Sequence, residues 1–405
     1  MNLSGSQTEG GHAYRHPPEG DLSCREFQVA EPVLNIETDP VETLRTVPLD
    51  ALHRGLGAKM VGFAGYALPV QYGPGVMAEH LHTRAKASLF DVSHMGQFSL
   101  HGPNAAATLE RLAPSDIQGL AAGRQRYTVL LNEAGGIEDD LMVANYGDRL
   151  VIVANASRKE ADGHLLAEYL LDGVTLEQHP QRALLALQGP SAAAVMQALC
   201  PQAAALRFLG VTEAIIAGAP VWISRSGYSG EDGFEISVRE EAAATVAEAL
   251  LAHPDVLPAG LGARDSLRLE AGLCLHGSDI DDVTTPVEAS LAWTIAKRRR
   301  AAADFIGAAP ILDQLEHGAT RLRVGIRPIG RAPARADTAI LAPDGTAAGS
   351  ITSGGYSPTL GAPIAMGYVR RDLTDLGTEL GLLIRAETQT AQVAALPFVP
   401  TRYAK

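Results

Sequence analysis

The greatest density of candidate catalytic groups lies in residues 133–143, Glu-Ala-Gly-Gly-Ile-Glu-Asp-Asp-Leu-Met-Val. A Gly-Gly turn leads into an apolar run through two adjacent carboxylates, Asp139 and Asp140. Because side chains alternate between the faces of a strand, we expect one acid to face a cavity and the other to cap the turn. Burial raises the pKa of a carboxyl and suits it to proton transfer near neutral pH. The alternative is that both acids only stabilise the turn.

A second candidate segment, Ser-Gly-Tyr-Ser-Gly-Glu-Asp-Gly-Phe-Glu, spans residues 226–235. Its three glycines permit a backbone that bulkier residues could not follow, which indicates a loop shaped for a ligand. The segment lacks the Gly-x-x-x-x-Gly-Lys pattern and the spacing of dinucleotide-binding loops, so it does not indicate a nucleotide. Glu235, at the start of the next strand, is suited to accept two hydrogen bonds from a ring with adjacent N–H donors.

A third candidate segment, residues 262–272, is typical of a helix that ends at a glycine. Arg264 and Arg268 share one face at a spacing of four, while Asp265 and Glu270 are placed to pair locally. The segment therefore predicts either ligand-binding arginines or a surface ion network.

Three histidines, His80, His82 and His94, raise the question of a metal. The first two lie in the predicted helix 77–87, where residues two apart diverge, and no nearby cysteine or acid completes a zinc set. We therefore expect no metal site.

The three cysteines, Cys24, Cys200 and Cys274, form no CxxC pair, which favours a reducing compartment, and the last two are expected to pack in cores. Residues 1–42 contain eight acidic side chains, among them Glu9, Glu19, Asp21, Glu26 and Glu31, whereas mitochondrial presequences are poor in acids. We therefore expect a cytoplasmic protein.

The net charge of −13 argues against a general nucleic-acid binder, and no apolar stretch approaches the length of a membrane span. One basic run, residues 297–300, departs from this balance. It is either a solvated helix end or a docking site for an acidic partner.

The pattern of elements predicts an α+β protein with antiparallel sheets. The opening residues 1–42 are rich in Gly, Pro, Ser and charge and are expected to form a disordered tail. Residues 43–305 are predicted to form two interleaved α+β domains, and residues 306–405 a small β-barrel. The clearest strands are 128–131, 141–144, 150–154, 183–187, 221–224 and 234–238, and the clearest helices 157–171, 191–200, 240–252 and 263–271.

Taken together, the sequence from about residue 44 onward resembles the T-protein of the glycine cleavage system. Several long segments occur in the family's order, which a lone short motif would not match. They are GAKMVGFAGYALPVQY (57–72), AEHLHTRAKASLFDVSHMGQ (78–97), NEAGGIEDDL (132–141), ALQGP (186–190), SGYSGEDGFEISV (226–238), ARDSLRLEAGLCLHGSDID (263–281), TPVEASLAWT (285–294) and PFVPTRY (397–403).

The resemblance implies a three-domain cloverleaf around a central channel, with a ferredoxin-like middle layer and a C-terminal β-barrel. It also implies an aminomethyltransferase that passes a one-carbon unit from the lipoyl arm of H-protein to tetrahydrofolate as co-substrate. By the same resemblance, Asp140 is the catalytic acid. The implied folate-binding residues are Met95, Tyr127, Tyr228, Glu235, Arg264 and Tyr403.

Two features depart from the family pattern: the segment before residue 43 has no counterpart, and Glu138 adds a charge next to Asp140. Two other functions share parts of the pattern. One is a folate-dependent demethylase of an amine or sulfur compound, and the other is a non-enzymatic folate-binding scaffold. The completeness of the T-protein segments favours the aminomethyltransferase.

Overall fold

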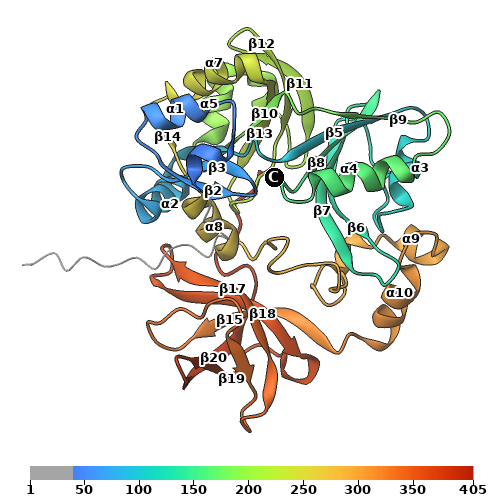
Figure 1. Ribbon diagram of the computed structural model, residues 1–405, viewed down its shortest axis with the longest axis vertical. Coiled ribbons are helices and arrows are strands. Elements are labelled where there is room, and N and C mark those ends of the chain that lie inside the picture. The colour runs from blue at the N-terminus through green and yellow to red at the C-terminus, as the bar shows by residue number, and fades with distance from the viewer. Residues whose placement is uncertain (1–39, 405) are drawn as a thin grey trace, which may run out of the picture. The chain divides into compact units, whose positions relative to one another are not determined.

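The computed structural model describes residues 40–404, all of which belong to one compact unit, Glu31–Lys405. The predicted tail, residues 1–42, lies outside the described residues except for its last three positions, and Cys24 lies outside them as well. Figure 1 shows two α+β layers and a barrel. No helix among residues 40–404 is long and apolar enough to cross a membrane.

One layer is a six-stranded sheet with the order β11-β12-β13-β10-β4-β14. Its pairs are antiparallel except that β14 runs parallel to β4. Its apolar core lies between the sheet and helices α5 and α7. The strands are β4 (Ala87–Asp91), β10 (Arg182–Gln188), β11 (Val211–Ile216), β12 (Ala219–Ser224), β13 (Gly233–Arg239) and β14 (Val256–Pro258). The associated helices are α1 (Asp50–Gly55), α2 (Val76–Ala85), α5 (Ala192–Leu199), α6 (Pro201–Ala204), α7 (Glu240–Leu251) and α8 (Leu261–Glu270).

The other layer is a five-stranded antiparallel sheet with the order β6-β7-β8-β5-β9. The chain enters it between β4 and β5 and leaves it between β9 and β10, so this layer is inserted into the first. The strands are β5 (Gly96–His101), β6 (Arg124–Leu131), β7 (Ile137–Asn145), β8 (Arg149–Ala154) and β9 (Thr175–Gln178), with helices α3 (Ala105–Glu110) and α4 (Lys159–Glu168).

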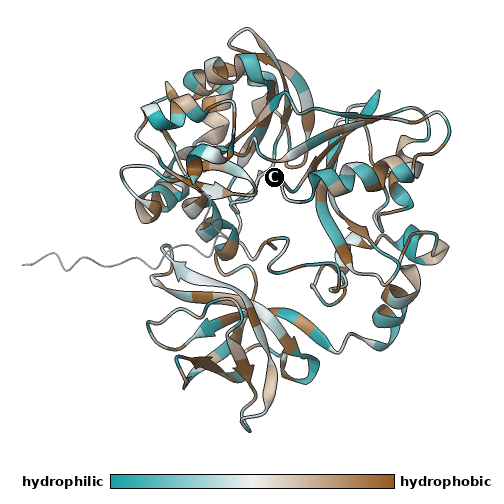
Figure 2. Cartoon of the chain, viewed as in Figure 1, coloured by the Kyte–Doolittle hydropathy of each residue, from teal (hydrophilic) through white to brown (hydrophobic). Residues whose placement is uncertain are grey.

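The C-terminal part closes into a six-stranded barrel, β15-β18-β17-β16-β19-β20. Figure 2 shows hydrophobic residues along its strands, and the buried members form one core cluster. The strands are β15 (Arg321–Pro328), β16 (Ala339–Leu341), β17 (Ala347–Ser357), β18 (Ala362–Arg370), β19 (Glu379–Ile384) and β20 (Glu387–Ala394). Helices α9 (Lys297–Ala302) and α10 (Ala308–His317) precede it. A small sheet near the start of the described chain has the order β1 (Arg45–Thr46), β3 (Tyr66–Gln71) and β2 (Lys59–Phe63).

The predicted α+β class and C-terminal barrel are confirmed, and each of the strands and helices predicted above is present. The predicted antiparallel sheets are confirmed, and two short edge strands depart from that pattern, because β14 pairs with β4 and β1 with β3 in parallel. Both exceptions are strands of two or three residues, too short to show a pattern of their own.

Candidate functional site

A cavity of about 1110 Å³ opens between the two α+β layers and the segment that follows α8. Its lining combines residues from β6, β7, β13 and α8 with residues near the C-terminus. All seven residues implied by the family resemblance line it: Met95, Tyr127, Asp140, Tyr228, Glu235, Arg264 and Tyr403.

The paired carboxylates enter strand β7 in the predicted alternation. Asp139 pairs in register with Leu130 and is fully buried, whereas Asp140 pairs with Val129 and lines the cavity. The prediction that the other acid caps the turn is wrong for Asp139: Asn132 caps it, because its Oδ1 accepts a hydrogen bond from the Gly136 N–H at 2.9 Å. A side chain at Gly136 would collide with the backbone of Asp282, so the turn requires glycine there.

Asp140 is held by two donors. The Tyr127 hydroxyl donates to Oδ2 at 2.9 Å, and the Asn155 side-chain amide donates to Oδ1 at 2.6 Å. Burial, reinforced by the negative charge of Asp139, raises the pKa of Asp140 to about 7, while the two hydrogen bonds act in the opposite direction. A carboxyl with this pKa exchanges protons at neutral pH, as an acid–base group requires.

Two residues that the sequence reasoning did not single out complete this part of the site. Asn155 follows directly after β8, and a polar residue at a strand end is the signal that would have suggested it. Trp293 stacks on Tyr127 with ring centroids 5.5 Å apart, yet 65% of it is exposed. It therefore offers an aromatic face at the edge of the cavity.

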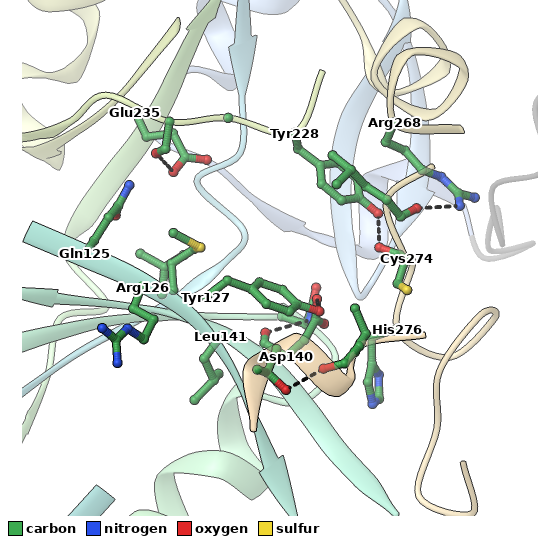
Figure 3. A pocket seen from close by; sticks show the side chains of 18 of the residues that line it. Gln125, Arg126, Tyr127, Asp140, Leu141, Tyr228, Glu235, Arg268, Cys274 and His276 are labelled. Atoms are coloured by element: carbon green, nitrogen blue, oxygen red, sulfur yellow. Dashed lines mark hydrogen bonds between the residues drawn. The ribbon is translucent and has the colours of Figure 1, made fainter. Parts of the chain in front are cut away.

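A second polar group lies elsewhere in the cavity. The Ser226 hydroxyl donates to Glu235 Oε2 at 2.9 Å, and the Arg264 guanidinium lies 4.7 Å from the centre of the Tyr228 ring. Burial lowers the pKa of Arg264, and the negative charge of Glu235 offsets part of this effect. Figure 3 shows Tyr127 and Asp140 close together, with Tyr228 facing Cys274 and Glu235 farther away. The Tyr228 hydroxyl donates to the Cys274 carbonyl.

The remaining two implied residues shape the walls. Tyr403 stacks on Phe208 with ring centroids 4.2 Å apart, and its neighbour Arg402 forms an ion pair with the buried Glu231 at 2.6 Å. Met95 is partly buried against the apolar cluster that contains Phe90. The chain near the C-terminus is thus fixed to the first α+β layer.

The predicted surface ion network on α8 is buried instead. Arg268 pairs with Asp265 at 2.9 Å and with Asp279 at 2.7 Å, and it is only 1% exposed. Glu270 forms no ion pair within the helix. It pairs instead with Arg84 of α2, at an N–O distance of 2.7 Å. These ion pairs tie the helix to its neighbours, which sequence spacing alone does not reveal.

The three histidines have different surroundings. His80 contacts Glu270 and Thr359, and His82 contacts the Asp255 carbonyl. Burial lowers the pKa of His94 to about 3, so this ring is neutral in the cavity wall. Among residues 40–404, no group of three or more His, Cys, Asp or Glu side chains is arranged to hold a metal ion.

The cysteine prediction holds for Cys200, which is buried in the core of the six-stranded layer. It is incomplete for Cys274, which packs in an apolar cluster but also lines the cavity.

The basic run at 297–300 is largely neutralised within the chain. Arg298 forms ion pairs with Glu110 and Asp116, and Arg299 is buried beside Asp304. Arg300 donates to two backbone carbonyls of the preceding segment. Three of the four basic side chains therefore already have partners within the chain.

Family models match most of the chain: the GCVT N-terminal domain at residues 49–299 and the glycine cleavage T-protein C-terminal barrel domain at residues 321–400. The chain belongs to the glycine cleavage T-protein family. The mitochondrial aminomethyltransferase of Gallus gallus is 49% identical over 89% of this chain and 94% of its own length. The mitochondrial aminomethyltransferase of Homo sapiens is 46% identical over 89% and 92%. The crystal structure of the glycine cleavage system aminomethyltransferase T from Bartonella henselae is 43% identical, covers 89% of this chain and 100% of its own, and has a TM-score of 0.84.

Members of the T-protein family are tetrahydrofolate-dependent one-carbon transferases, so the predicted class of enzyme is confirmed. The prediction of a cytoplasmic protein is contradicted, because relatives that cover most of the chain are named mitochondrial. That prediction rested on the acidic residues among positions 1–42, which precede the matched family model.

Proposed function

We propose that the cavity binds tetrahydrofolate and that the chain transfers to it the one-carbon unit of an aminomethyl-lipoyl arm, with release of ammonia. One observation carries this proposal: Asp140, a carboxyl with a pKa of about 7, lines the same cavity as the six residues implied for folate binding. Pockets for small ligands usually span about 300–1,000 Å³. A cavity of about 1110 Å³ therefore has room for folate and for the end of a second substrate.

Asp140 is proposed as the acid–base residue. Its carboxylate is suited to take a proton from the folate nitrogen that forms the new C–N bond and to stabilise positive charge that develops there. The two N–H protons lost from folate end on the departing ammonia and on the sulfur of the arm, so the overall reaction is balanced. Tyr127 and Asn155 keep the Asp140 carboxylate aimed at this position.

Glu235 is proposed to recognise the pterin, because a carboxylate matches the adjacent N–H donors along one edge of that ring. Ser226 fixes this carboxylate and Arg264 lies nearby, so the group is ordered before a ligand binds. The rings of Tyr127 and Tyr228 offer aromatic faces, and Met95 and Tyr403 close the walls.

Lipoylated H-protein is the proposed partner, since the family acts within the glycine cleavage system. The basic run 297–300 does not support a docking site, because most of its cations already have partners in the chain.

The test is a single-turnover assay with aminomethylated H-protein and tetrahydrofolate. Equal amounts of methylene-tetrahydrofolate and ammonia are expected, and a matched assay with a free methylated amine as donor is expected to give neither. Product from the methylated amine alone would contradict the proposal and favour a demethylase.

A further inference from the structure

A third buried carboxylate, Asp162 on α4, lies behind the paired acids of β7. It is 1% exposed, and neither of its carboxylate oxygens has a hydrogen-bond donor among the described residues. After burial, the Asp139 carboxyl has the largest effect on the pKa of Asp162, through its charge and through a shared hydrogen bond. Two buried carboxyls can make such a contact only if one of them carries a proton between them.

The hydrogen bonds around the pair indicate which acid carries the proton. Asp139 accepts from the Asn155 backbone N–H at 3.0 Å and from the Asn155 side-chain amide at 2.8 Å. These donors stabilise the ionised form of Asp139, whereas Asp162 has no comparable donor in the described part of the chain. The proton therefore belongs on Asp162.

Asn155 connects this pair to the cavity. Its side-chain nitrogen donates to Asp139 at 2.8 Å and to Asp140 at 2.6 Å, so the two hydrogens of one amide group span two carboxylates. A change at Asp139 therefore reaches Asp140 through a single side chain.

We propose that Asp162 is a positioning residue for the transfer reaction: it holds a proton against Asp139, and Asp139 and Asn155 together hold the Asp140 carboxylate towards the cavity. The part that concerns Asp140 rests on the proposed function. The titratable and charged groups that face the three acids from neighbouring elements are Glu138 and Arg158 beside Asp162, His276 beside Asp139, and Tyr127, Tyr228 and Cys274 around Asp140.

The electrostatics of the site agree with a proton on Asp162. Burial, followed by the charge of Asp139, raises the pKa of Asp162 to about 9, above the value of about 7 for Asp140. The negative charge of Glu138, which lies on β7 with Asp139 and Asp140, is compensated by an ion pair with Arg158 at 2.5 Å. At pH 8, Asp162 is therefore neutral while Asp140 is mostly ionised.

A first experiment detects the proton directly and without substrate. We expect the infrared difference spectrum of the full-length protein minus Asp162→Asn, at pH 8, to contain the C=O band of a protonated carboxylic acid. Asp148→Asn is the matched control, since Asp148 is an exposed acid paired with Arg149 at the β7–β8 turn. Absence of the band in the difference spectrum would overturn the protonation of Asp162, whatever the outcome for Asp140.

A second experiment tests positioning by kinetics. Asp162→Asn replaces a neutral donor with another, so we expect kcat within about twofold of wild type and an unchanged pH profile. If the acid limb of the kcat–pH profile of Asp162→Asn shifted to lower pH, Asp162 would carry a charge near Asp140 in the wild type. That result would overturn the proposal. Asp162→Leu removes the donor, and we expect kcat to fall about 10- to 100-fold with an unchanged KM for folate.

Unchanged kcat in a folded Asp162→Leu variant would exclude the positioning role. If this variant does not fold, Asp139→Asn takes its place. Its acid limb should move to lower pH, because the charge of Asp139 raises the pKa of Asp140, and an unmoved limb would contradict the coupling.

Discussion

Replacing Asp140 with asparagine should abolish most activity and, at the same time, stabilise the fold. The folded protein holds the pKa of Asp140 at about 7, against an ordinary value of 3.8. This difference corresponds to about 4 kcal/mol between the two protonation states. Because the folded-state value is the higher one, the unfolded chain loses this proton first as pH rises, and the carboxyl costs stability progressively between pH 3.8 and about 7.

Asp140→Asn removes that cost. The variant should therefore exceed the wild type in stability by up to about 4 kcal/mol at pH 8 and by under about 2 kcal/mol at pH 5. Its kcat should fall at least ~100-fold, since asparagine cannot accept the proton. The assays are chemical denaturation at both pH values and turnover with aminomethylated H-protein. Asp148→Asn, which removes an exposed carboxylate, should change neither quantity. A variant with near-normal kcat, or one less stable than wild type at pH 8, would refute the reasoning.

The other expectations concern the neighbours of Asp140 and the basic run. Tyr127→Phe removes a hydrogen bond that lowers the pKa of Asp140, so the acid limb of the kcat profile should move to higher pH; a shift to lower pH would contradict this assignment. Glu235→Ala should weaken folate binding in a titration by about 10-fold or more and leave the melting temperature nearly unchanged, and equal affinity would remove Glu235 from the site. Arg298 is 44% exposed and its buried partner Glu110 keeps Arg299 and Gln118, so Arg298→Ala should cost less than about 1 kcal/mol and leave the KM for H-protein unchanged; an increased KM would restore the docking interpretation.

Local patterns in the sequence were sufficient for much of the fold. The alternation of apolar residues identified β7 and the opposite orientations of Asp139 and Asp140. The resemblance to the T-protein family then supplied the seven cavity residues, which come from segments far apart in the chain. Neither source required knowledge of how the layers pack.

What escaped prediction depends on contacts between distant residues. Arg298 meets Asp116 across 182 positions, and Arg84 meets Glu270 across 186, so neither ion pair has a local signature. Asp162 looks like an ordinary polar residue of an exposed helix until α4 is packed against the sheet that carries Asp139. The turn before β7 likewise depends on Asn132, whose capping role is visible only in the folded chain.

The central claim is that the cavity holds folate with its reactive nitrogens beside Asp140. A crystal structure of the protein with reduced folate bound tests it most directly. We predict that the nitrogens that accept the one-carbon unit lie within hydrogen-bond distance of the Asp140 carboxylate, with Glu235 at the donor edge of the pterin. Folate bound outside this cavity, or inside it with those nitrogens turned away from Asp140, would contradict the account.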